Sequence, residues 1–312
     1  MKAFWTKTTR QSEKKQETRR SGLPTRPQLG MESLEARELY AGNVLASVSS
    51  VGTLLITGDN SSNCVAVDQY TDGGVKKLWV HACPGDTTKI NGVLGAQLIV
   101  PKGAVKGISA SLAGGDDTFG FGPQGGASVD GFLSMSMGSG KDQVDIGAYS
   151  EINGKLSINT SSGDDKVHLE VATVTSNTVI NTGSGKDKVE VKSATYLKGH
   201  LYIDTGTGTD QLHLQNSAVG GTSLIKTGDD SDLVCIDHMA FDKAVEVYLG
   251  DATGFLAFDV LDVHDSTFKG SFKADGEAGG DIYDADNNTF NVAPVVMNFE
   301  SYVDIDCDKL FS

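Results

Sequence analysis

The chain has 312 residues, with 38 glycines, 6 prolines, 38% apolar and 7% aromatic side chains, and a formal net charge of -15. The chain contains no run of about 18 apolar residues, so we expect no transmembrane segment. Glycine is abundant and proline scarce, which excludes collagen and favours an all-β, turn-rich protein rather than a disordered one.

Charge is divided unevenly along the chain. Residues 1–30 contain eight Lys or Arg and two Glu, a net charge of +6. Because the whole chain has a net charge of -15, residues 31–312 carry a net charge of -15 - 6 = -21. Arg37 is the last arginine in the chain, so residues 38–312 lack the side chain best suited to binding phosphate through two parallel hydrogen bonds. An acidic body repels nucleic acids and anionic lipids and attracts cations, so we expect no nucleic-acid partner.

Residues 1–41 are predicted to be a basic, disordered leader, because they lack the apolar core of roughly 7 to 15 residues of a conventional signal peptide. The pattern Leu34-Glu35-x-Arg37-x-Leu39-Tyr40-Ala41 resembles the LEPR-XLL type leader of bacterial surface and secreted proteins. Ala36 stands where that family often has Pro, and Tyr40 where a second Leu is usual. The resemblance implies a bacterial protein that is secreted or held at the cell surface; the alternative is a plain disordered tail.

Residues 42–105 are predicted to form an irregular N-terminal β cap, with strands around 53–67, 78–83 and 94–100. An open end of a stacked β structure exposes unpaired backbone groups, so a cap is expected there. The four cysteines can pair in three ways. A bridge between Cys64 and Cys83 would staple this cap, and Cys235 and Cys307 would either form a second bridge or remain free thiols.

Residues 106–285 contain a repeat of about 22 residues. It is marked by eight anchor aspartates: Asp117, Asp142, Asp165, Asp187, Asp210, Asp232, Asp259 and Asp281. The residues two and four positions after every anchor are apolar, and the residues between them are mostly polar. This alternation predicts a strand with one buried face after each anchor.

Two further segments recur in each repeat. A second strand, such as Leu156-x-Ile158 or Leu201-x-Ile203, runs into a glycine turn such as Gly183-Ser184-Gly185-Lys186-Asp187. An isolated apolar residue also recurs, for example at Val174 and Leu197. Three segments per unit predict an all-β fold, a parallel and right-handed β-helix, in which stacked coils share one core. Residues 286–312 would form the C-terminal cap, and the competing fold is a β-sandwich.

The glycine turns suggest a metal site. The Gly-x-Gly-x-Asp turns resemble half of the hemolysin-type calcium repeat, although that family repeats every nine residues and this chain only once per coil. The resemblance implies calcium ligands in one column: Asp142, Asp165, Asp187, Asp210 and Asp232. Oxygen-ligated Ca²⁺ would relieve the repulsion between stacked carboxylates. In the alternative, each Asp lies at a solvated corner and accepts hydrogen bonds from its own turn.

A second column of ligand types is predicted on the outward face, three residues after each anchor. It comprises Asp145, His168, Glu190, His213, Cys235, Asp262 and Asp284. His168, Glu190 and His213 would lie near enough to share a Zn²⁺-like ion if their side chains converge. A solvated ladder of neighbouring side chains is the favoured interpretation.

Catalysis is disfavoured by the sequence. Many β-helices are polysaccharide lyases or glycoside hydrolases, and a hydrolase needs two carboxylates at a defined separation in a sugar-binding groove. Here the acidic pairs belong to the turns, the repeat has no arginine, and no nucleophile elbow, phosphate-binding loop or His-Glu-x-x-His motif occurs. We therefore expect a non-enzymatic structural, adhesive or surface-interaction protein whose partners are extracellular macromolecules.

Overall fold

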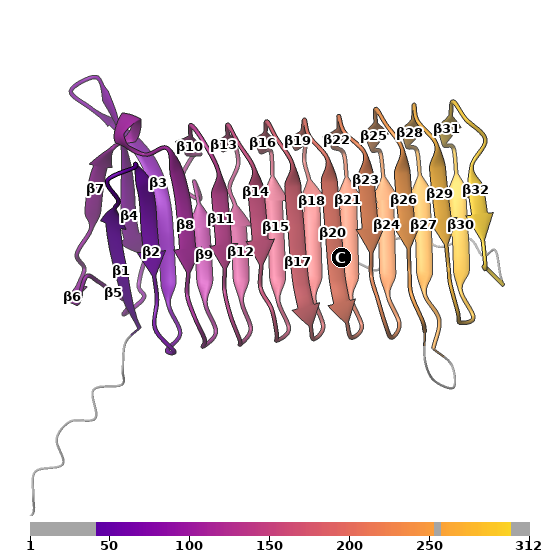
Figure 1. The fold of residues 1–312 in the computed structure, drawn as a ribbon, viewed down its shortest axis with the longest axis horizontal. Coiled ribbons are helices and arrows are strands. Elements are labelled where there is room, and N and C mark those ends of the chain that lie inside the picture. Colours follow the sequence, from indigo (N-terminus) through magenta and orange to yellow (C-terminus); the bar gives the residue numbers. More distant parts are fainter. Residues whose placement is uncertain (1–41, 253–256, 301–312) are drawn as a thin grey trace, which may run out of the picture. The chain divides into compact units, whose positions relative to one another are not determined.

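A computed structural model describes residues 42–252 and 257–300; the predicted leader, residues 1–41, and residues 301–312 lie outside this range. The described residues form a β-solenoid in which successive coils stack side by side, each coil adding one strand to each of three sheets (Figure 1). The predicted parallel β-helix is thereby confirmed. The competing β-sandwich is wrong, because strands pair in parallel from one coil to the next, as Val167 does with Val144 and Val189.

The largest sheet, here called sheet 1, has thirteen strands. Its parallel members are β2 (Thr53–Thr57), β8 (Gly107–Ser111), β11 (Leu133–Ser136), β14 (Leu156–Asn159), β17 (Thr178–Ser184), β20 (Leu201–Thr207), β23 (Ser223–Lys226), β26 (Val245–Tyr248), β29 (Phe272–Asp275) and β32 (Val295–Met297). At the N-terminal edge it also holds β1 (Asn43–Val48), β5 (Lys89–Ile90) and β6 (Val93–Leu94).

Sheet 2 has eleven strands and contains the segments that follow the anchor aspartates. They are β9 (Thr118–Phe121), β12 (Gln143–Ile146), β15 (Lys166–Glu170), β18 (Lys188–Lys192), β21 (Gln211–Gln215), β24 (Leu233–Asp237), β27 (Val260–His264) and β30 (Ile282–Asp286). Beyond β9, the N-terminal edge of the sheet holds β3 (Cys64–Asp72), which follows Asn63, and then β4 (Val75–Ala82) and β7 (Leu98–Pro101). A 3-10 turn, Lys102–Ala104, links β7 to the first full coil.

Sheet 3 has eight strands of two residues each, built around the isolated apolar position of the repeat. They are β10 (Ser128–Val129), β13 (Glu151–Ile152), β16 (Thr173–Val174), β19 (Tyr196–Leu197), β22 (Ala218–Val219), β25 (Ala240–Phe241), β28 (Thr267–Phe268) and β31 (Thr289–Phe290). The coil is therefore three-sided, as the three recurring segments predict.

One apolar core runs through the coils. Of the sixteen apolar positions that follow the anchors, all but Ala285 are buried. Towards the C-terminal end, the rings of Phe241, Phe268 and Phe290 stack from coil to coil, with centroids 5.2 and 4.9 Å apart. The coils bury a shared apolar set that none of them could bury alone.

Residues 42–105 contain all the antiparallel strand pairs of the described residues, including β5 with β6. β1 pairs with β2, β3 with β4, and β4 with β7, all antiparallel. The parallel ladder nevertheless starts inside this segment, because β2 pairs with β8 and β3 with β9. At the other end, β31 and β32 continue the parallel stack as far as Met297.

Candidate functional site

The predicted calcium residues belong to a buried row that we call the aspartate ladder. Its eight members, each at most 3% exposed, are Asp117, Asp142, Asp165, Asp187, Asp210, Asp232, Asp259 and Asp281. From Asp117 to Asp259, the backbone N–H of each donates a hydrogen bond of 2.8–3.0 Å to Oδ1 of the aspartate one coil further along. The alternative of a solvated corner, with hydrogen bonds from the residue's own turn, is therefore wrong.

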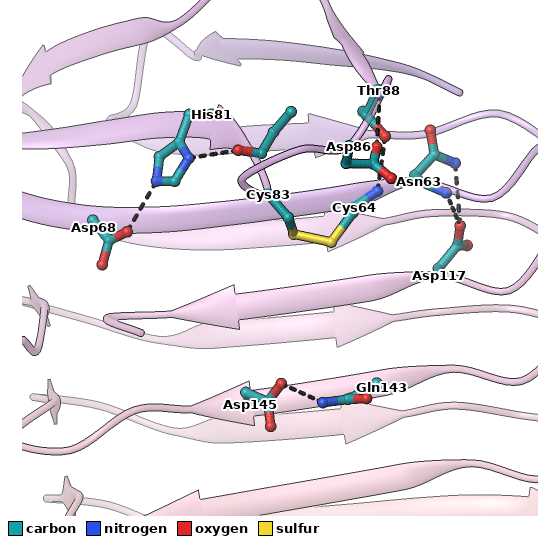
Figure 2. Close-up of a disulfide and its surroundings, with 11 residues drawn as sticks. Asn63, Cys64, Asp68, His81, Cys83, Asp86, Thr88, Asp117, Gln143 and Asp145 are labelled. Carbon is teal, nitrogen blue, oxygen red and sulfur yellow. Dashed lines mark hydrogen bonds and ion pairs between the residues drawn. A yellow bond between two sulfur atoms is a disulfide. The ribbon is translucent and has the colours of Figure 1, made fainter. Parts of the chain in front are cut away.

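The two ends of the aspartate ladder are closed by other residues. Asn63 donates its backbone N–H and its amide Nδ2 to Oδ1 of Asp117, over 2.7 and 3.2 Å (Figure 2). At the other end, the N–H of Asp281 donates to Oε2 of Glu300 over 2.7 Å. The row of side-chain acceptors is thus unbroken from the first coil to the last described one.

Glycines before the ladder let neighbouring coils approach closely. Gly185 and Gly208 have φ angles of 139° and 117°, which favour glycine. A Cβ added at Gly208 would lie 1.7 Å from the carbonyl oxygen of Gly185, so no side chain fits there. At this corner, the backbone of one coil packs directly on the backbone of the next. The aspartate that follows the glycine turn is buried, and its carboxylate accepts a hydrogen bond from the backbone of the preceding coil.

The second carboxylate oxygen of each ladder residue has no hydrogen-bond donor among the described residues. All eight Oδ2 atoms are buried in this state. A row of threonines, Thr160, Thr182, Thr205 and Thr227, accompanies the ladder, and the hydrogen-bonding interaction of each hydroxyl lowers the pKa of the aspartate five residues later. Each of these hydroxyls, however, donates its proton to a carbonyl of the next coil over 2.7–3.1 Å. Each hydroxyl oxygen can still accept a hydrogen bond from the O–H of a neutral carboxyl group.

Burial raises the pKa of every carboxyl in the ladder, since the charged form loses its solvation. The pKa is raised to about 6 for Asp142 and Asp187, to about 7 for Asp117, Asp210 and Asp259, and to about 8 for Asp232. The pKa values of Asp165 and Asp281 are raised for the same reason. Hydrogen bonds from the backbone oppose the rise but do not cancel it, so part of the ladder is protonated at neutral pH.

Two species can satisfy the orphaned Oδ2 atoms: a proton or a cation. A proton on Oδ2 lets the carboxyl donate to the adjacent threonine while Oδ1 keeps its backbone bond. Calcium takes six to eight oxygen ligands, whereas each carboxylate here has one oxygen already engaged. Calcium binding by Asp142, Asp165, Asp187, Asp210 and Asp232 stays a prediction, and the donor set favours the proton.

The outward column lies in register as the spacing predicts. Asp145, His168, Glu190, His213, Cys235, Asp262 and Asp284 are successive partners across sheet 2. Within it, Glu190 Oε1 lies 3.5 Å from Nζ of both Lys188 and Lys192. Opposite charges thus neighbour one another along and beside the column, which is the arrangement of a side-chain ladder. His213, Cys235 and Asp262 are buried, however, so the column is not solvated along its whole length as predicted.

Ligand-type side chains converge elsewhere than at the predicted histidines. In the described part of the chain, three donor atoms come within 4.8 Å of one another in only two groups: Asp262, His264 and Asp284, and Asp237, His238 and Asp265. The atoms of His168, Glu190 and His213 do not converge in this way. Asp262 and His264 share a strand face at spacing i, i+2 and Asp284 follows in the next coil, so the same register argument could have found this group.

The N-terminal cap contains a disulfide and a buried ion pair. Cys64 and Cys83 are joined, with Cα atoms 5.3 Å apart, which confirms that predicted bridge (Figure 2). His81 Nε2 lies 2.9 Å from Oδ2 of Asp68, and the His81 ring stacks on Trp79. Cys235 is also disulfide-bonded. Its predicted partner, Cys307, lies outside the described residues.

A shallow cavity lies on the outer face of sheet 1. The repeat pattern of the sequence does not predict it. It measures about 380 Å³ and is lined by Leu224, Lys226, Gly228, Glu246, Tyr248, Gly250 and Glu277. Two carboxylates, one ammonium group and one aromatic ring therefore border the same hollow. The long gap of 27 residues between Asp232 and Asp259 obscures the alignment of this coil in the sequence.

No family model, curated protein or solved structure matches the chain. In residues 42–252 and 257–300, no helix is long and apolar enough to cross a membrane.

Proposed function

We propose that the chain is an exported, non-catalytic bacterial β-solenoid that serves as a structural or adhesive element outside the cytoplasm. The observation that carries this proposal is the aspartate ladder. Its carboxylates, the most numerous candidate reactive groups of the repeat, face inward and bond one coil to the next. A group that is at most 3% exposed and bound to backbone is suited to holding coils together rather than to meeting a substrate.

A disulfide bond supports the proposed location outside the cytoplasm. The Cys64–Cys83 disulfide is of a kind that persists in oxidising compartments, such as the periplasm and the cell exterior. The resemblance of Leu34 to Ala41 to an export leader points the same way, although that segment lies outside the described residues. The outer faces of the sheets would then be the surfaces that meet extracellular macromolecules.

The proposal is tested by locating the chain and assaying it for catalysis. The full chain with an epitope tag is expressed in a bacterial host that exports LEPR-XLL type proteins, and intact cells are treated with protease. We expect loss of the tag from intact cells, together with no release of reducing ends or unsaturated products from polysaccharides. Protection of the tag until the cells are lysed would overturn the location, and accumulating products would establish the alternative of a lyase or hydrolase.

A second candidate function, a calcium-dependent binding module, is favoured by one observation: the Oδ2 atoms of the ladder are buried acceptors without a donor. A calcium titration distinguishes this module from a metal-independent β-solenoid.

A further inference from the structure

The cavity on sheet 1 is built from neighbouring strands in fixed register. Leu224 on β23 pairs with Glu246 on β26, and Lys226 pairs with Tyr248, so these four side chains project from two adjacent strands on the same face. Glu277, in the turn after β29, completes the border on the third coil. A volume of about 380 Å³ lies within the range of small-ligand sites, about 300 to 1,000 Å³.

The aromatic ring in this cavity is held in place. The Tyr248 hydroxyl donates a 3.1 Å hydrogen bond to Oε2 of Glu246 and accepts one of 3.1 Å from Nζ of Lys273. The same ammonium lies 4.4 Å from the ring centroid, so one ring face carries a cation. Lys273 is on β29, whereas the cavity extends to Leu224 and Lys226 on β23. The ring face towards β23 is therefore the one that a ligand would meet.

The remaining groups specify the chemistry of that ligand. The Tyr248 ring and the Leu224 side chain offer apolar surface for the C–H face of a sugar ring, while Glu246 and Glu277 offer carboxylates for hydroxyl and ammonium donors. Lys226 supplies one donor for a ring or glycosidic oxygen. The acidic body, -21 over residues 31–312, repels polyanions and attracts cations.

We propose that this cavity binds an amino sugar within a cationic glycan. The inference rests on the proposed adhesive function and names its ligand class and its site. The ammonium group of the sugar lies between Glu246 and Glu277, and the sugar ring stacks on Tyr248. Neutral and anionic glycans lack the charge that the two carboxylates select.

The test uses the full chain and three glycan probes of equal length: a glucosamine tetramer, an N-acetylglucosamine tetramer and a galacturonate tetramer. Binding is measured by isothermal titration calorimetry, and the contacting protons by saturation-transfer NMR. We expect the glucosamine tetramer to bind most tightly. Tyr248→Ala and Glu246→Gln should each weaken its binding about tenfold, since a charge-assisted hydrogen bond or a stacked ring contributes on that scale.

A matched control is available on sheet 3. Tyr196 is an exposed tyrosine that, like the half-buried Tyr248, has a lysine near its ring: Nζ of Lys198 lies 5.9 Å from the ring centroid. Tyr196→Ala should bind the glucosamine tetramer as the unaltered chain does, and far-ultraviolet circular dichroism melts confirm that both variants fold. Glu277→Gln should weaken binding of the cationic tetramer more than that of the acetylated one.

The outcomes that overturn the site differ from those that overturn the proposed function. Tightest binding of the galacturonate tetramer, no measurable binding of any tetramer, or equal binding by Tyr248→Ala and the unaltered chain would overturn this inference. The chain could still be exposed at the cell surface and inactive on polysaccharides, and the proposed function would then survive. Protease protection in intact cells would instead overturn the proposed function.

Discussion

The backbone N–H of Asp187 donates a 2.8 Å hydrogen bond to Oδ1 of Asp210, one coil further along the stack. The N–H of Asp165 makes the same bond to Asp187. Each carboxyl group therefore holds the backbone of the preceding coil, while its own backbone is held by the next. The shape of the aspartate side chain and the hydrogen bond that its Oδ1 accepts stabilise the stacking of the coils, whereas the negative charge of the buried carboxylate destabilises it.

Substitutions at Asp187 should separate these contributions. Asp187→Asn keeps an oxygen acceptor for the N–H of Asp165 and removes the charge, so we expect the free energy of unfolding at neutral pH to stay within about 1 kcal/mol or to rise. Asp187→Ala leaves that N–H buried without an acceptor and should cost about 1 to 3 kcal/mol. Urea unfolding followed by circular dichroism measures both. Asp251→Ala, at an exposed corner, is the control; equal losses in all three variants would contradict the role of the ladder.

Stability should fall as pH rises through the neutral range. The folded chain holds protons on the ladder up to pKa values of about 6 for Asp187, about 7 for Asp210 and about 8 for Asp232, whereas the unfolded chain releases them near about 4. Between these values the folded state binds more protons, so the slope of stability against pH is negative. The contribution is complete below about pH 4 and is lost as the pH passes the folded values.

Thermal unfolding at about pH 5, 7 and 9 and constant ionic strength measures this dependence. We expect the highest midpoint near pH 5 and the lowest near pH 9. A chain carrying Asp187→Asn, Asp210→Asn and Asp232→Asn should show a flatter profile, because three titrating groups are gone. A midpoint that climbs from pH 5 to pH 9 in the unaltered chain would mean that the ladder is ionised throughout.

Calcium should have little effect on the melting midpoint at neutral pH. Each Oδ1 is engaged with backbone and the ladder is at most 3% exposed, so the site offers calcium few free ligands. Melts in EDTA and in millimolar Ca²⁺ test this, since a ligand of the folded state raises stability by mass action. A clear rise with Ca²⁺ that disappears in Asp187→Asn would establish the calcium-dependent module instead.

Gly206→Ala should be among the most damaging single changes in the repeat. Gly206 has a φ of 99°, and a Cβ there would lie 1.9 Å from the carbonyl oxygen of Gly183 in the neighbouring coil. We expect a loss of at least about 2 kcal/mol in urea unfolding. Gly85→Ala is the matched control, because its φ of 83° also lies beyond the usual left-handed region of L-residues but nothing lies within 4 Å of the added Cβ. If both variants lose the same free energy of unfolding, the strained backbone angle, and not the close contact between coils, causes the loss.

The coil architecture could be predicted because its signal is periodic. Phe119 and Phe121 stand two and four residues after Asp117, and the same spacing recurs at every anchor, so a short alternation repeated eight times is hard to mistake. The Cys64–Cys83 bridge, by contrast, could be only one of several pairings until β3 and β4 were known to lie side by side.

The burial of the aspartates could also have been predicted from the same alternation. Asp165 lies two residues before Val167 and four before Leu169, and residues at even spacing share one face of a strand. Residue type argues against an inward position for Asp165, because aspartate is rarely buried, and the stacking hydrogen bonds override that preference here. The cavity at Tyr248 depends on the register of β23 with β26, which the irregular 27-residue coil conceals.

The aspartate ladder also makes the length of this protein adjustable in whole units. Asp187 and Asp210 make equivalent bonds on both sides, so the interval between them could be duplicated or deleted while each remaining coil meets a neighbour of the same kind. Loss of a single residue within a strand has no such solution, since the side chains that follow it in that strand would change faces. Genes for such chains can therefore lengthen or shorten by duplication and deletion of complete coils, with Asn63 and Glu300 closing the row at whatever number is reached.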